Sequence, residues 1–203
     1  MAKKLTTTHV LSETFLANHA FLTSEIDKLY SVLNALRHEG RPQLGKNLRR
    51  LNESTRFLHD GLAKIMDYEE KCLFPFIGTH IPRFQPLIFL LCSEHEDFRR
   101  LLLDLQSALA ALKRQKEAAH QFRVIQRIEE KGAYLVCLLR SHLWAEDKKI
   151  FDAARQELRK GEKEKLIQQI LGYHKQRIAP TDQRISKSRK NSPSLRSVPC
   201  DKI

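Results

Sequence analysis

The residues of this chain that could do chemistry are concentrated around an imidazole and a carboxylate four positions apart, His142 and Glu146. On a helix this spacing places both side chains on one face, one turn apart. The same face is otherwise apolar and advances in steps of four and three, with a repeated four at Ile150: Ile128, Gly132, Leu135, Leu139, His142, Glu146, Ile150 and Ala153. A helix buries such a stripe in a bundle. A charge buried there needs an opposite charge or a metal ion, so the other helices should supply a partner.

Four segments of the chain have apolar residues at helical spacing and are predicted to be long helices: residues 8–37, 43–77, 83–114 and 117–158. The stretch Gly40-Arg41-Pro42 is expected to separate the first two helices, and Gly78 to follow the end of the second. Each of the first three stripes is interrupted by one polar residue: His19, Glu69 and His95.

The short loops between these segments predict an all-α fold, an up-down-up-down four-helix bundle. In that topology position 65 and His95 both lie about 18 Å from the turn that joins their helices, at 1.5 Å per residue. The same counting places five polar residues in one layer of the core: His19, Glu69, His95, His142 and Glu146. One histidine on an apolar face is usually an ordinary core residue. Five such groups in one layer favour a metal site, and mixed imidazole and carboxylate ligands suit Fe, Mn or Zn.

Two stretches of sequence are similar to a known family. The stretch Glu69 to Pro75, EEKCLFP, resembles the HxxxEExxLFP signature of hemerythrin-like (HHE cation-binding) domains, and His142 to Phe151, HLWAEDKKIF, resembles a second copy. His19 and His95 resemble the single histidines of the helices that precede each copy. The resemblance implies a four-helix bundle around a non-heme di-iron centre. Members of the family bind dioxygen, sense or detoxify oxygen and nitric oxide, or repair damaged iron centres.

Carried over by position, the resemblance implies a set of metal ligands. His19, His95 and His142 would be terminal imidazole ligands, and Glu69 and Glu146 bridging carboxylates. The first signature also requires a histidine four residues before Glu69, where this chain has Ile65. His59 does not replace it, because His59 is ten residues before Glu69, which places it about 80 degrees around the helix from Glu69 and about 15 Å along it. Five of six ligands would leave one iron with an open position, a site for a single ion, or a site that no longer binds metal.

The ends of the chain differ from its centre in composition. Residues 1–174 are predicted to form the bundle, including a short C-terminal helix over residues 162–174. Residues 175–203 carry half of the net charge of +12 and are predicted to be a basic, disordered tail. The tail lacks aromatic residues for base stacking, so a solvated segment is favoured over one that contacts nucleic acid or an anionic surface.

Several classes of protein are excluded by what the sequence lacks. No apolar stretch approaches the roughly 20 residues of a membrane span, and the N-terminus has no apolar core of a secretory signal. The four cysteines show no CxxC spacing, which makes a zinc ribbon a poor fit. These features predict a cytoplasmic protein.

Two functions remain open. The first is a non-heme iron protein that holds one or two ions and binds or senses a small gas, dioxygen or nitric oxide. The alternative is a metal-free or degenerate hemerythrin fold that serves as an interaction module for a protein partner, with the basic tail as a contact. Ile65 favours the alternative. Glu69 and Glu146 favour the iron protein, because buried carboxylates suit a packing module poorly.

Overall fold

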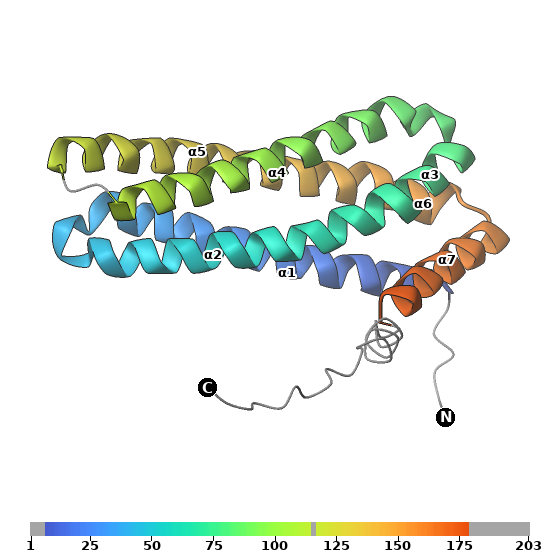
Figure 1. The fold of residues 1–203 in the computed structure, drawn as a ribbon. Coiled ribbons are helices and arrows are strands. Elements are labelled where there is room, and N and C mark those ends of the chain that lie inside the picture. Colours follow the sequence, from blue (N-terminus) through green and yellow to red (C-terminus); the bar gives the residue numbers. More distant parts are fainter. Residues whose placement is uncertain (1–6, 115–116, 179–203) are drawn as a thin grey trace, which may run out of the picture.

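The computed structural model describes residues 7–114 and 117–178, together with the side chains of most of them. All secondary structure in these two ranges is helical, which confirms the all-α prediction (Figure 1). None of the described helices combines the length and the apolar character needed to cross a membrane.

The first half of the chain contains two long helices, α1 (Thr7–His38) and α2 (Gly40–Tyr68). The helical path of α2 continues through a π-helical turn, η1 (Glu69–Leu73), into α3 (Phe74–His80). Two boundary predictions were wrong. Pro42 lies in the first turn of α2, where its missing N–H costs nothing because those amides have no intrahelical partner, and Gly78 lies inside α3.

The second half repeats this plan after a short 3-10 turn, η2 (Pro82–Phe84). The long helices are α4 (Gln85–Arg114) and α5 (Ala118–Ala145), and α5 continues through a second π-helical turn, η3 (Glu146–Phe151), into α6 (Asp152–Glu157). The predicted C-terminal helix is present as α7 (Lys160–Ile178). It ends four residues beyond the predicted boundary at 174, and residues 179–203 of the predicted tail lie outside the described part of the chain.

The four long helices lie side by side, and consecutive ones run in opposite directions (Figure 1). α1 packs against α2 and α5, and α4 packs against the same two helices. α7 folds back at one end, where it contacts α1 and η1. This arrangement brings η1 and η3, which lie far apart in sequence, to the same level of the fold.

The apolar core is divided into two clusters along the helix axes. The first core cluster extends from the predicted layer of five polar residues toward the α1–α2 turn and includes Leu29, Leu58 and Leu105. The second core cluster lies toward α3, α6 and α7 and includes Phe74, Ile77 and Leu166. In sequence, His95 and Glu146 fall between residues of the two clusters, Glu69 and His142 lie next to this boundary, and His19 precedes the α1 residues of the first cluster. These five polar residues therefore occupy the middle of the core.

Gly132 allows α5 to approach α1 closely. A Cβ atom at this position would lie 2.7 Å from two carbon atoms of the buried Leu33 side chain. Replacement of a helical glycine by alanine normally stabilises a helix by about 0.5–1 kcal/mol. We expect Gly132→Ala to lower the melting temperature instead, since Leu33 must move. Gly45→Ala is the matched control, because nothing lies within 4 Å of a Cβ at Gly45, and it should raise the melting temperature. Equal effects of the two substitutions would contradict close packing at Gly132.

Candidate metal centre

All five residues that the sequence placed in one layer meet in the interior. At most 5% of any of their side chains is exposed. Ligand-type atoms of four of them lie within 4.8 Å of one another: Glu69, His95, His142 and Glu146. The fifth, His19, joins through its Nε2 atom, which is 3.3 Å from Oε2 of Glu146 and 4.0 Å from Oε1 of Glu69. The predicted juxtaposition is therefore present.

Each of the two carboxylates faces histidines on both of its sides. Glu69 directs Oε1 toward His19 and Oε2 toward His95, whose Nε2 atom is 3.5 Å away. Glu146 directs Oε2 toward His19 and Oε1 toward His142, whose Nε2 atom is 3.6 Å away. The two carboxylates thus lie between His19 and the pair formed by His95 and His142.

A second ring of carboxylates surrounds the histidines. Nδ1 of His95 lies 2.7 Å from Oε1 of Glu70, and Nδ1 of His142 lies 2.7 Å from Oε2 of Glu94. Nδ1 of His19 lies 3.0 Å from Oδ1 of Asp147, although the two atoms are not aligned for a hydrogen bond. A carboxylate next to Nδ1 favours the tautomer that is protonated there, which leaves the Nε2 lone pair free.

This arrangement fills the centre with acceptors. With a proton on each Nδ1, the Nε2 atoms of His95 and His142 would face each other as lone pairs at 3.1 Å. The carboxylates of Glu69 and Glu146 are acceptors as well, and Oε1 of Glu146 has no hydrogen-bond donor among the described residues. Only protons or a cation can make such a centre favourable in a buried environment. A divalent cation fits this donor set, because imidazole nitrogen and carboxylate oxygen are its common ligands.

The two π-helical turns explain how neighbouring residues all reach the centre. η1 begins with Glu69 and η3 begins with Glu146. In each case the next residue is a carboxylate beside a histidine, Glu70 at His95 and Asp147 at His19. A π turn is wider than an α turn, and such turns are frequent at functional sites.

Two phenylalanines follow the same repeat. The residue five positions after each central glutamate is a phenylalanine that packs on the same histidine as the outer carboxylate. The ring of Phe74 stacks on His95 with centroids 5.7 Å apart, and the ring of Phe151 is tilted against His19 at 4.9 Å. Each motif therefore holds the histidine of the opposite half of the chain.

The two halves differ at one pair of positions. Glu94 directly precedes His95 and holds His142. The corresponding residue before His19 is Asn18, and the position that corresponds to His142 is Ile65. The side chain of Ile65 is partly buried and packs against the first core cluster. The chain thus lacks both an imidazole and the carboxylate expected to hold it. His59 does not compensate, since its side chain is 37% exposed and pairs with Asp60.

Comparison with known proteins identifies the family. The model of the hemerythrin HHE cation binding domain matches residues 10–154, which include all five central residues. The chain belongs to this family. No curated protein and no solved structure gives a significant match. The predicted family is therefore confirmed, and a metal cation is the cofactor that membership implies.

The outer carboxylates of this hemerythrin domain were missed by the reasoning from sequence. Glu70, Glu94 and Asp147 are each adjacent in sequence to a central residue, in the pairs 69–70, 94–95 and 146–147. Adjacency is a poor guide on an α-helix, where neighbours point about 100 degrees apart. For Glu70 and Asp147, the signal that could have identified them is the recurrence of an acidic neighbour after each central glutamate, whereas Glu94 has no such counterpart because Asn18 precedes His19.

The environment of the centre shifts the pKa values of its histidines in opposite directions. Burial lowers the pKa of His19, but the nearby carboxylates of Glu146 and Glu69 outweigh burial and raise it to about 10. Burial also opposes the proton on His142, yet Glu146 and Glu94 raise its pKa to about 9. Burial and the charge of His142 lower the pKa of His95. Without metal, the domain therefore holds protons on His19 and His142 at neutral pH.

The pKa values of the two central carboxylates, Glu69 and Glu146, also shift in opposite directions. Burial and the charge of Glu146 raise the pKa of Glu69. Burial has the same tendency at Glu146, but His142 and His19 hold the pKa of Glu146 below its usual value. The metal-free centre is therefore balanced by protons shared among acidic and basic groups, and a cation would replace these protons.

Metal binding should strengthen as pH rises. The pKa values of His19 and His142 lie above 7 and that of Glu69 is also raised, so cations that fill the centre must displace at least two protons at neutral pH. The affinity for zinc, which undergoes no redox change, should therefore rise by about 100-fold or more per pH unit between pH 6.5 and 7.5. Competition with a chelator at each pH measures the affinity, and a weakly buffered titration counts the released protons. An affinity that does not change with pH would show that these two imidazoles are not ligands.

Proposed function

We propose that this hemerythrin domain is a non-heme iron protein that binds or senses dioxygen or nitric oxide. In this proposal α1, α2, α4 and α5 form an up-down-up-down four-helix bundle whose middle layer holds the metal. The observation that carries the proposal is the convergence of five buried acceptor groups, with a carboxylate at Nδ1 of every histidine. Membership of a cation-binding family supports it.

The geometry of the carboxylates favours two ion positions. The first would take His95, His142, Oε2 of Glu69 and Oε1 of Glu146. The second would take His19 and the remaining oxygen atom of each carboxylate, so that Glu69 and Glu146 bridge the two ions. Two ligand atoms that each lie about 2 Å from a shared ion are at most about 4 Å apart, and the present N···O separations of 3.3–4.0 Å fall within this limit.

The two positions would not be equivalent. The first would have four protein ligand atoms and two outer carboxylates. The second would have three ligand atoms, because Ile65 supplies no ligand. When bound, iron would supply an open coordination position there at which a diatomic gas can bind.

The residues of this chain have separate roles in the proposal. Glu70, Glu94 and Asp147 orient the imidazoles, and Arg99 fixes Glu70 by an ion pair of 2.8 Å. The rings of Phe74, Phe98 and Phe151 surround the histidines and exclude water from them.

A second candidate function is a degenerate fold that binds no metal and contacts a protein partner. It is favoured by the loss of both members of the pair at positions 18 and 65. It gives no account of why five acceptor groups stay buried together, since each would cost several kcal/mol without a cation or proton. The basic tail that could serve as its contact lies largely outside the described residues.

Metal titration of variants tests the proposed ligands. The wild-type protein should bind iron with one tighter and one weaker affinity. His142→Ala should weaken the tighter site and His19→Ala the weaker one. Each loss should exceed the roughly 10–100-fold that removal of an outer partner costs. Glu146→Ala should weaken both, and Glu130→Ala is the control, because Glu130 is an exposed carboxylate of α5. Absence of bound iron in the wild-type protein grown with added iron would rule out the iron proposal.

Introducing a histidine at position 65 and a carboxylate at position 18 tests whether the weaker ion site has a free coordination position. Ile65→His combined with Asn18→Glu should tighten the weaker site and reduce reaction with nitric oxide, since the new imidazole would occupy the free position. Absorption spectra before and after nitric oxide addition measure this change. If the centre binds no metal, Ile65→His alone should bury an unpaired imidazole. It should then lower the free energy of unfolding by about 1–3 kcal/mol without any gain of iron.

A further inference from the structure

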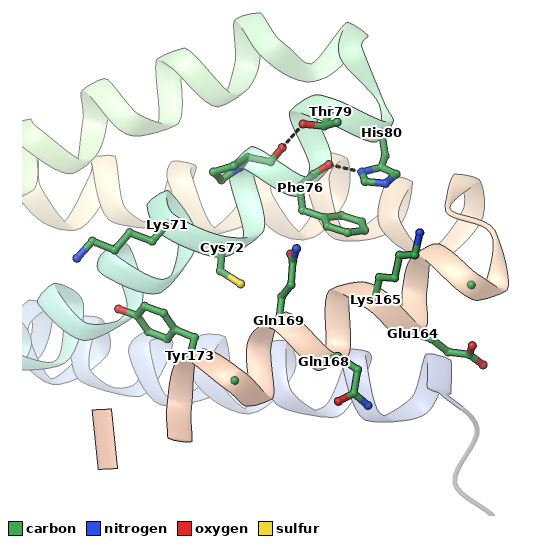
Figure 2. A pocket seen from close by; sticks show the side chains of 13 residues that line it. Lys71, Cys72, Phe76, Thr79, His80, Glu164, Lys165, Gln168, Gln169 and Tyr173 are labelled. Atoms are coloured by element: carbon green, nitrogen blue, oxygen red, sulfur yellow. Dashed lines mark hydrogen bonds between the residues drawn. The ribbon is translucent and has the colours of Figure 1, made fainter. Parts of the chain in front are cut away.

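A cleft of about 1290 Å³ lies between α7 and the segment formed by η1 and α3 (Figure 2). None of the five central residues lines it. Its walls include the side chains of Cys72, Phe76 and Tyr173, which give it a largely apolar interior. The volume exceeds the range of about 300–1,000 Å³ that is typical of sites for small molecules, so a ligand would fill only part of the cleft.

The charged side chains that line the cleft are two lysines and one glutamate, and Thr79, His80, Gln168 and Gln169 add further polar groups. Of the two lysines that line it, Lys71 is paired with Asp67 at 2.5 Å. Lys165 is exposed and has no ion pair among the described residues. Its side chain extends toward His80, and the amide of Gln169 points toward Cys72 (Figure 2).

No negative charge compensates Lys165 inside the cleft. The carboxylate of Glu164 is the one acidic group among the described lining residues, and Figure 2 shows it directed away from the interior. The carboxylate of Asp67 already accepts hydrogen bonds or ion pairs from Lys71 and Tyr173. The cleft thus combines an apolar surface with one cation that has no ion pair and, of its two glutamine amides, the one of Gln169 that is directed inward (Figure 2).

We propose that this cleft binds a small amphipathic carboxylic acid. Its carboxylate would lie at Lys165 and the Gln169 amide, because a charged acceptor forms the strongest hydrogen bonds with an ammonium donor. Its hydrocarbon part would cover the apolar wall at Cys72 and Phe76. This site is separate from the candidate metal centre, so it does not depend on the proposed function.

Binding of decanoate to the full-length protein tests the proposal, with decylammonium as the probe of opposite charge. Isothermal titration below the micellar concentration should show saturable binding of decanoate to one site, and at least tenfold weaker binding of decylammonium. Lys165→Gln should weaken decanoate binding about tenfold. Lys160→Gln is the matched control, because Lys160 is an exposed residue of α7 that does not line the cleft, and it should bind decanoate like the wild type.

A second variant closes the cleft without disturbing the fold. Gly172 lines the cleft, and nothing lies within 4 Å of a Cβ built there. Gly172→Phe should therefore abolish decanoate binding while the melting temperature is maintained. Leu171→Phe, at an exposed position outside the cleft, is its control. No saturable binding to the wild type, unchanged binding to Gly172→Phe, or equal binding of the two probes would overturn the proposal.

Discussion

The structure depends on the burial of five hydrogen-bond acceptors at one level of a helical core. Water would solvate these groups well, and the apolar interior does not. The fold therefore requires a cation or a set of shared protons between Glu69, Glu146 and the three histidines. Much of the surrounding structure serves this requirement. The outer carboxylates fix the imidazoles, the π turns direct adjacent residues inward, and the two apolar clusters on either side keep the layer dry.

The two halves of the chain meet this requirement unequally. His95 and His142 have carboxylates that are close and well aligned, whereas Asp147 is close to His19 but not aligned with it. The His19 side also lacks the ligand expected at position 65. The absence of an imidazole at position 65 agrees with the absence of a carboxylate at position 18, since a carboxylate there would have no imidazole to hold.

Periodicity and charge in the sequence were sufficient to predict the helices and the central layer. An apolar stripe that is broken by His19, Glu69 and His95 identifies both the buried face and its unusual members. The π turns were not predicted, although the repeated step of four from His142 through Glu146 to Ile150 is the trace of η3. The outer carboxylates and the cleft beside α7 could not be predicted, because they depend on which residues of different helices face one another. The stretch Gly40-Arg41-Pro42 predicts a break between helices, whereas α2 already begins at Gly40, because a proline in the first turn of a helix breaks no hydrogen bond.

Each half of the chain supports a histidine of the other half, and this has a consequence for the release of a bound ion. Glu70 and Phe74 hold a histidine of α4, and Asp147 and Phe151 hold a histidine of α1. Separation of the α1–α2 hairpin from the α4–α5 hairpin would therefore remove ligands and their supports together. Release of an ion held at His19 would then follow the rate at which the hairpins part, whereas an ion held by His95, His142 and Glu146 would keep these three ligands on the second half of the chain. Under this kinetic control, residence time would change with mutations in the apolar clusters that never touch the ion.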